Sequence, residues 1–369
     1  MKIGILTLPF TWNYGGLLQA FALQKVFHNL GHEVVIINRR QNRDNILIRL
    51  IVWLKWSLIK ILRNFKIFQF IPLVAAEVFK KQNFRCITSN IFSDKGVRKM
   101  ADSNKLNAYV VGSDQVWNYG YPPHLYNYFL DFTEGEDVVR LAYAASFGRE
   151  GWHFSAEETL ACSKLVKKFD GVSVREKSGV ELCEKHLRVD AHHHLDPTLL
   201  LEKEDYIEII QKSKTSPTNG KLLLYILDRS GENEKIIDKV KGITGLTPFA
   251  VKQGKTSTLI KNALKGIYPS VNQWLKSFYD AEFVITDSFH GTVFSIIFNK
   301  PFIAIGNRKR GLARFNSLLK MFELEGRLIA NVTDISEEQI NTPIDWLKVN
   351  EEIYAQKLKG VQYLNKHLK

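Results

Sequence analysis

Cysteine is scarce in this sequence. Its three cysteines, Cys86, Cys162 and Cys183, lie far apart, and their odd number argues against a disulfide framework. We therefore expect reduced thiols, as in a cytosolic protein. No signal-peptide cleavage pattern precedes the strand pattern of residues 1–6, so secretion is not expected. The histidines at 192–194 are adjacent, so their side chains alternate in direction along a strand, and we expect no metal site there.

Acidic residues are outnumbered. The chain has 51 Lys and Arg against 38 Asp and Glu, a formal net charge of +13 and a pI of about 9.4. This balance suits anionic small molecules, an anionic membrane surface or nucleic acid. Since no nucleic-acid motif is present, nucleic acid is not an expected partner. A length of 369 residues with 45% hydrophobic residues predicts a globular protein with two domains.

Long uninterrupted apolar runs are also missing. Residues 46–79 are rich in Ile, Leu, Trp and Phe, but basic residues interrupt every window of membrane-spanning length. At 100° per residue, Arg49, Trp56, Lys60 and Arg63 share one face of a predicted amphipathic helix. Such a helix either lies on an anionic membrane surface or packs its apolar face on its own domain.

The first segments form a βαβ pattern. A buried strand at 3–8, a helix patterned by Leu18, Ala22, Val26 and Leu30, and a strand at 33–37 predict a parallel sheet. A turn at 13–16 would lie at the carboxyl end of the first strand. Open α/β sheets bind ligands at this edge. The glycines of this turn either contact a ligand or simply form the turn.

Two further strand ends carry charged residues. Asp114 and Gln115 follow a strand at 106–111, and Arg175 follows a strand at 171–174. The charged side chains of Asp114 and Arg175 are expected at the same edge of the sheet. Alternatively, Asp114 caps the next turn and Arg175 pairs with Glu176 at the surface. Ser178 is a candidate cap of the following helix.

A linker-like composition at 215–220 predicts a domain boundary. We assign 1–215 to a first α/β domain that contains the insert at 46–79, 220–345 to a second α/β domain, and 346–369 to a terminal helix. The second domain is predicted to contain strands at 222–227, 249–251, 283–286 and 302–305, with helices at 232–240 and 272–279.

The most informative stretch is 286–292. It follows a buried strand and precedes an apolar run, and Thr292 is the predicted N-cap of a helix. Helix N-termini attract phosphate or carboxylate groups. His290 lies in this stretch, and histidine as a residue type titrates near neutral pH, so proton transfer is available beside an anion site. In the alternative interpretation, Asp287 and His290 only hydrogen-bond the backbone.

A basic run follows the last predicted strand. Arg308, Arg310 and Arg314 lie within seven residues, so this run is either a second anion site or solvated surface.

Six segments occur in an order that resembles the polysaccharide pyruvyl transferase family. They are residues 13–20, 112–118, 173–176, 196–200, 287–291 and 299–302. The resemblance runs from about residue 1 to about residue 315. It implies two Rossmann-like α/β domains facing across a cleft, as in GT-B glycosyltransferases. It also implies transfer of the pyruvyl group of phosphoenolpyruvate to a sugar of a bacterial cell-surface polysaccharide or its precursor, which forms a ketal and releases phosphate.

The resemblance also suggests roles for particular residues. His290 would be the general acid or a phosphate ligand, and Asp114 the base that activates the sugar hydroxyl. Relatives often carry an arginine at the position of Ser288 or Phe289, which this chain lacks. The expected donor-binding residues are Arg175, Ser288, Gly291, Thr292, Arg308, Arg310 and Arg314. The expected acceptor-binding residues are Asn13, Gly15, Gly16 and Gln115. No cofactor or metal is expected, since phosphoenolpyruvate is itself the donor substrate.

Two other functions remain open at this point. A GT-B glycosyltransferase using a nucleotide sugar shares the fold, but residues 292–298 carry no acid that would hold a ribose. A non-catalytic membrane-associated scaffold is the third interpretation. We expect a cytoplasmic protein that associates peripherally with the inner face of the membrane, and the acceptor is either free or lipid-linked.

Overall fold

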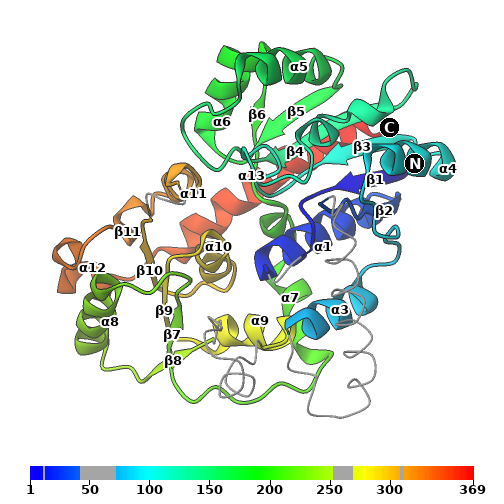
Figure 1. Cartoon of the computed structure of the whole chain (residues 1–369). Helices are drawn as coiled ribbons and strands as arrows, with labels where there is room; N and C mark the ends of the chain where they lie inside the picture. Colours follow the sequence, from blue (N-terminus) through cyan, green and yellow to red (C-terminus); the bar gives the residue numbers. More distant parts are fainter. Residues whose placement is uncertain (11–12, 42–71, 252–268, 308–310) are drawn as a thin grey trace, which may run out of the picture.

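The computed structural model describes residues 1–10, 13–41, 72–251, 269–307 and 311–369, and it contains two parallel sheets (Figure 1). The first sheet has the spatial order β2 (Glu33–Ile37), β1 (Lys2–Leu6), β3 (Ala108–Val111), β4 (Val139–Ala145), β5 (Gly171–Val174) and β6 (His192–His193). The second has the order β11 (Leu328–Ile329), β10 (Phe302–Ile305), β9 (Phe283–Thr286), β7 (Leu222–Tyr225) and β8 (Pro248–Ala250). The predicted α/β fold with two parallel sheets is confirmed.

Helices connect the strands of both sheets. The α-helices are α1 (Tyr14–Asn29), α3 (Pro72–Asn83), α4 (Asp94–Asn104), α5 (Ala156–Val166), α6 (Lys177–Leu182), α7 (Lys203–Gln211), α8 (Gly231–Thr244), α9 (Val271–Asp280), α10 (Phe289–Ile297), α11 (Ala313–Met321), α12 (Glu337–Asn341) and α13 (Trp346–His367). Short 3₁₀ turns occur at Leu125–Phe129, Asp131–Thr133, Pro197–Leu200, Glu325–Arg327 and Val332–Asp334, and a π turn occurs at Cys183–Leu187.

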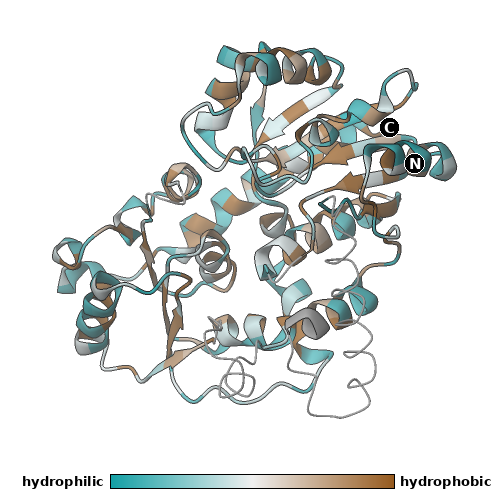
Figure 2. Ribbon diagram, in the orientation of Figure 1, coloured by the Kyte–Doolittle hydropathy of each residue, from teal (hydrophilic) through white to brown (hydrophobic). Residues whose placement is uncertain are grey.

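Hydrophobic residues concentrate in the strands, whereas the outer faces of the helices are largely polar (Figure 2). Every residue of β3 and of β9 is buried, since helices cover both faces of a parallel sheet. Local signals set the helix ends. Ser155 and Glu158 form a capping box that begins α5, and Gly245 ends α8 in the left-handed conformation.

Three predicted helix starts are wrong. α1 begins at Tyr14, so the glycines at 15 and 16 lie in its first turn rather than in a preceding loop. α10 begins at Phe289, because the Ser288 hydroxyl accepts a hydrogen bond from the Gly291 N–H (3.3 Å) and caps the helix. Thr292 is already helical there. α6 begins at Lys177, so Ser178 lies inside that helix and does not cap it.

The chain crosses between the two sheets more than once. The predicted linker lies between α7 and β7, yet α7 contacts α9 through a hydrogen bond from Asn272 Nδ2 to the Ile209 carbonyl. α13 begins beside the second sheet and returns to the first (Figure 1), where Tyr363 Oη donates to the Ala142 carbonyl (3.1 Å). The last helix therefore ties the two domains together.

The predicted basic amphipathic helix cannot be compared with the structure over most of its length. Residues 42–71 lie outside the described residues, and α3 covers only the end of the insert. Within the described parts of the chain, no helix is long and apolar enough to cross a membrane.

A buried histidine lies where α13 meets the first sheet. His194 stacks on Tyr143 (ring centroids 5.9 Å apart) and contacts Tyr363 (4.7 Å). Burial lowers the pKa of His194 to about 4, and the charges of His192, His193 and Lys359 act in the same direction. The folded protein therefore holds this imidazole neutral over a pH range in which the unfolded chain protonates it.

We predict that the free energy of unfolding falls as the pH drops from about 6.5 to about 4. In this window the unfolded chain binds a proton at His194 that the folded protein does not bind, which costs up to about 3 kcal/mol. Urea unfolding at pH 7.5 and pH 5 measures this loss. His194→Gln should reduce it, whereas exposed His153→Gln should not. An equal loss in wild type and His194→Gln would contradict this assignment.

Candidate functional site

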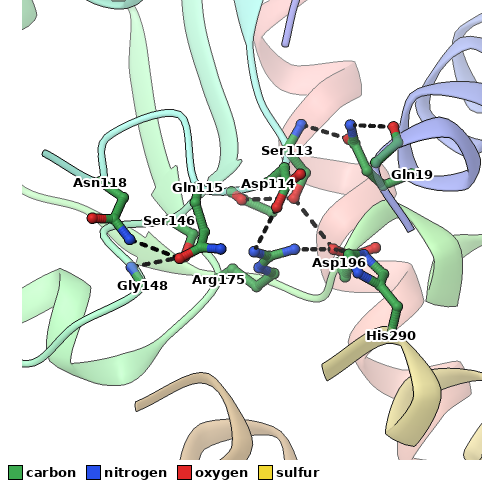
Figure 3. A network of polar contacts seen from close by, with 12 residues as sticks. Gln19, Ser113, Asp114, Gln115, Asn118, Ser146, Gly148, Arg175, Asp196 and His290 are labelled. Atoms are coloured by element: carbon green, nitrogen blue, oxygen red, sulfur yellow. Dashed lines mark hydrogen bonds and ion pairs between the residues drawn. The ribbon is translucent and has the colours of Figure 1, made fainter. Parts of the chain in front are cut away.

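Strand ends of the first sheet bring three charged side chains together. Arg175 follows β5, and Asp114 and Asp196 come from the segments after β3 and β6. Arg175 Nη1 donates to Asp196 Oδ2 (2.5 Å), and Arg175 Nη2 contacts Asp114 Oδ1 at 3.4 Å (Figure 3). All three side chains are at most 5% exposed. The predicted convergence of Asp114 and Arg175 is observed, and Arg175 pairs with these carboxylates rather than with Glu176.

Asp196 has the largest number of polar partners in this group. Its Oδ1 accepts hydrogen bonds from the Thr198 N–H (3.0 Å) and hydroxyl (2.7 Å), and the Ser113 hydroxyl lies 3.4 Å from Oδ2. Burial opposes ionisation, but neighbouring His290 and the charge of Arg175 hold the pKa of Asp196 well below its usual range. Asp196 is thus a carboxylate that orients Arg175. In the sequence, only its place in a family-like segment indicated importance.

His290 approaches the same carboxylate from the second domain. It lies in the first turn of α10, is 6% exposed, and its Nε2 is 3.6 Å from Asp196 Oδ2. That distance exceeds a hydrogen bond, so the contact is electrostatic. Arg175, Asp196 and His290 consequently form one polar group that spans both domains (Figure 3).

The first turn of α1 closes over this group. A Cβ atom on Gly15 would lie 2.0 Å from His290 Nδ1, so only glycine permits the observed approach. A Cβ on Gly16 would lie 3.2 Å from Asn13 Nδ2 and 3.4 Å from Asp114 Oδ2. The Asn13 side chain makes no hydrogen bond that caps α1. The structure thereby places Asn13, Gly15 and Gly16 beside the two residues predicted to be catalytic.

Other residues of the 286–292 stretch fix the backbone around the site. The Asp287 carboxylate accepts hydrogen bonds from the N–H groups of Leu227 (2.6 Å) and Asp228 (2.8 Å), which fixes the loop after β7. For Asp287, the alternative interpretation of the sequence, in which this side chain hydrogen-bonds the backbone, therefore agrees with the structure. Ser288 caps α10, and Thr292 is fully buried and donates its hydroxyl to the Ser288 carbonyl (3.3 Å). A Cβ on Gly291 would lie 2.2 Å from Thr286 Oγ1.

A second arginine reaches the site from α11. The Cζ atoms of Arg175 and Arg314 lie 4.7 Å and 5.4 Å from the centre of the Phe289 ring. Burial and the nearby charge of Arg175 lower the pKa of Arg314 to about 10, so it stays protonated at neutral pH. Two cations from different domains thus share one aromatic ring. Predicted Arg308 and Arg310 lie outside the described residues.

Gln115 lies to one side of Arg175. Its Oε1 accepts from Asn118 Nδ2 (2.7 Å), and a Cβ on neighbouring Gly148 would lie 2.1 Å from that oxygen (Figure 3). The Glu176 carboxylate binds the same turn, where its Oε1 accepts from the N–H groups of Phe147 (2.7 Å) and Gly148 (2.9 Å).

Two negative observations concern the described residues alone. No group of three or more His, Cys, Asp or Glu side chains there is placed to hold a metal ion. A cavity of about 240 Å³ is lined by Glu202, Asn299 and Tyr354 among others, and Arg175, Asp196 and His290 do not line it. Arg175, Asp196 and His290 are each at most 6% exposed in this structure.

Known structures share this architecture. The UDP-GlcNAc 2-epimerase of Neisseria meningitidis bound to UDP-GlcNAc matches at a TM-score of 0.53 and 10% identity, over 100% of this chain and 94% of that one. Medicago truncatula UGT71G1 complexed with UDP-glucose matches at 0.52 and 10% identity, over 98% and 97%. The UDP-N-acetylglucosamine 2-epimerase of Rickettsia bellii matches at 0.51 and 10% identity, over 100% and 99%. The fold is therefore the two-domain Rossmann-like GT-B fold.

The sequence itself assigns the family. The family model for polysaccharide pyruvyl transferase matches residues 13–309, and the chain belongs to this family. The matched range contains every described residue of the polar group at the domain boundary. No curated protein sequence matches the chain significantly. The protein is accordingly a transferase of polysaccharide biosynthesis.

We predict that Gly15→Ala lowers transferase activity by about 100-fold, because the new Cβ would displace His290 by an ångström or more. The variant should remain folded, as judged by circular dichroism. Gly242→Ala in α8 is the matched control, since nothing lies within 4 Å of its added Cβ. Wild-type activity in Gly15→Ala would mean that this close approach is not needed for turnover.

Proposed function

We propose that this transferase moves the pyruvyl group of phosphoenolpyruvate onto a sugar of a bacterial cell-surface polysaccharide or its precursor. The observation that carries the proposal is the buried group of Arg175, Asp196, Asp114 and His290, which joins both domains. It combines a cation for the donor, a histidine for proton transfer and a carboxylate that can serve as a base.

The charges suit a small, strongly anionic donor. Phosphoenolpyruvate carries a phosphate and a carboxylate, which bind well to guanidinium groups and helix N-termini. Arg175 and Arg314 face the ring of Phe289, and the first turns of α1 and α10 meet beside them. In the place where family relatives often carry an arginine, this chain has Ser288 and Phe289, and Arg314 supplies a guanidinium from α11 instead.

The proposed steps balance without an oxidant or reductant. His290 gives a proton to the methylene carbon of the donor, which becomes the methyl group, and Asp114 takes the proton of a sugar hydroxyl as its oxygen bonds to C2. A second hydroxyl then bonds to C2 while the C2–O bond to phosphate breaks, and its proton leaves with the phosphate. The products are a cyclic ketal and inorganic phosphate.

We predict that phosphoenolpyruvate raises the melting temperature of the wild-type protein, because a ligand that binds only the folded state stabilises it. A panel of nucleotide sugars should not raise the melting temperature.

His290→Gln should lower acceptor-dependent phosphate release by at least about 100-fold while the protein remains folded. Exposed His153→Gln serves as the matched control and should keep wild-type turnover.

Each result separates the candidate functions. A melting shift with a nucleotide sugar and none with phosphoenolpyruvate would point to a glycosyltransferase. Full phosphate release in His290→Gln would remove that residue from the chemistry. Absence of turnover with any acceptor, together with absence of donor binding, would favour the scaffold.

We also propose that the protein associates with the inner face of the membrane through residues 46–66, where a lipid-linked acceptor would be available. The support is the basic, Trp-bearing sequence pattern, which lies entirely outside the described residues. We predict that the protein floats with vesicles containing anionic lipid at low salt and is released at high salt. Neutral vesicles are the control. Retention in the soluble fraction at low salt would contradict the association.

A further inference from the structure

A buried carboxylate follows Arg175 in the chain. Glu176 is 0% exposed, and its Oε1 accepts hydrogen bonds from the Ser146 hydroxyl (3.0 Å) and from the N–H groups of Phe147 (2.7 Å) and Gly148 (2.9 Å). Its Oε2 has no hydrogen-bond partner in the part of the chain that the structure describes. A buried charge is stable only when hydrogen bonds complete it. One carboxylate oxygen therefore holds three consecutive residues, which we call the β4 turn because they follow β4.

The β4 turn touches the second domain. A Cβ atom on Gly311 would lie 2.1 Å from the Gly148 carbonyl oxygen and 3.2 Å from its carbonyl carbon. Gly311 also has a φ of +79°, which favours glycine. Only glycine at this position permits the two backbones to approach so closely. In the helix that Gly311 precedes, Ser317 Oγ accepts from the Lys177 N–H (2.8 Å), which joins α11 to α6 (Figure 1). The start of α11 and one of its side chains thus contact the first domain.

The helix held by these contacts carries the second arginine of the site. Arg314 lies in the first turn of α11, shortly after Gly311. Its Cζ is 5.4 Å from the centre of the Phe289 ring, and the Cζ of Arg175 is 4.7 Å from the same centre. Glu176 follows Arg175 directly in the chain, and the turn that it holds contacts the start of α11. A movement of the β4 turn would therefore change the separation of the two guanidinium groups.

The β4 turn is also joined to the segment that carries Asp114. The Ser146 N–H donates to the Asp114 carbonyl (3.0 Å), and the Ser146 carbonyl accepts from the Trp117 N–H (3.1 Å). A Cβ on Gly148 would lie 2.1 Å from Gln115 Oε1, so the turn packs directly against this segment (Figure 3). The turn consequently lies between the residue proposed as the base and the helix that supplies the second arginine.

We propose that Glu176 is a positioning residue for donor binding. By holding the β4 turn, it sets the place at which α11 docks on the first domain, and so it fixes Arg314 relative to Arg175. Glu176 acts through the turn and not on the donor itself. The role needs only the hydrogen bonds to Oε1, since Oε2 has no partner among the described residues. This inference rests on the proposed function, in which the two arginines bind the anionic groups of phosphoenolpyruvate.

The first test measures the Kd of the full-length protein for phosphoenolpyruvate by titration calorimetry. Glu176→Ala should raise the Kd tenfold or more, because the turn loses three hydrogen bonds. Glu176→Gln should keep the Kd within about threefold, since the amide oxygen accepts the same three bonds. Glu158→Ala is the matched control and should keep the wild-type Kd. Glu158 Oε2 also accepts from a backbone N–H (2.8 Å), but it does so in the capping box of α5, on the outer side of the first domain (Figure 1).

A second variant disturbs the same contact from the other domain and leaves Glu176 intact. Gly311→Ala should also raise the Kd about tenfold, because its new Cβ would push the β4 turn and α11 apart. Gly135→Ala is its control, since Gly135 has a similar φ of +87° and nothing lies within 4 Å of its added Cβ. The double variant Glu176→Ala/Gly311→Ala should bind within about twofold of the weaker single variant, since both changes remove one contact.

Hydrogen exchange gives a measurement that needs no ligand. Amide exchange in α11 of the ligand-free protein should become faster in Glu176→Ala and stay as in wild type in Glu158→Ala, because the first substitution loosens the docking of a helix in the other domain. Unchanged exchange in α11 would show that Glu176 only stabilises the first domain and would overturn the proposal.

The binding results can overturn it as well. A wild-type Kd in both Glu176→Ala and Gly311→Ala would do so, and so would a raised Kd that Glu176→Gln does not restore, because charge and not the held turn would then matter. If Glu176→Ala does not fold, Gly311→Ala with its control decides. Failure of the wild-type protein to bind phosphoenolpyruvate would contradict the proposed function, and the exchange of α11 would then decide the positioning role by itself.

Discussion

The contact between Arg175 and Asp196 is the interaction on which the site depends. Removing two charges from water costs more than their mutual attraction returns unless further hydrogen bonds complete the pair. The structure supplies these bonds, because Thr198 and Ser113 satisfy the carboxylate, and Asp114 faces the second amino group of Arg175. The guanidinium is consequently held at a fixed place before any ligand arrives. Such preorganisation lets a site stabilise developing charge without rearranging.

The complete polar group, by contrast, requires the two domains to approach closely. His290 completes the group from α10, and Gly15 allows the first turn of α1 to lie directly against its ring. At a second point of the boundary, the Lys177 N–H donates to Ser317 Oγ (2.8 Å). The boundary is thus held at two points, one at the polar group and one between α6 and α11.

Much of the fold and part of the site followed from sequence. Apolar runs ending in polar residues located the strands, so the positions of Asp114 and Arg175 could be predicted. Asp196 could not be identified as the second carboxylate partner of Arg175, because its role depends on where the edge strand β6 lies in space. The start of α10 was misplaced because Ser288 and Thr292 are both good caps, and only tertiary packing chooses between them. Local sequence patterns likewise do not predict which residues of one domain contact residues of the other.

The two arginines at the domain boundary share their electrostatic surroundings. Asp114 and Asp196 contact Arg175 directly. The buried carboxylate of Glu176 acts on both Arg175 and Arg314 and favours the charged form of each. Burial and the charge of Arg175 act on Arg314 in the opposite direction and lower its pKa. The Phe289 ring lies against both guanidinium groups and reduces their repulsion, because its face is electron-rich. Contact between the two domains thus brings two cations together only where carboxylates and an aromatic face accompany them.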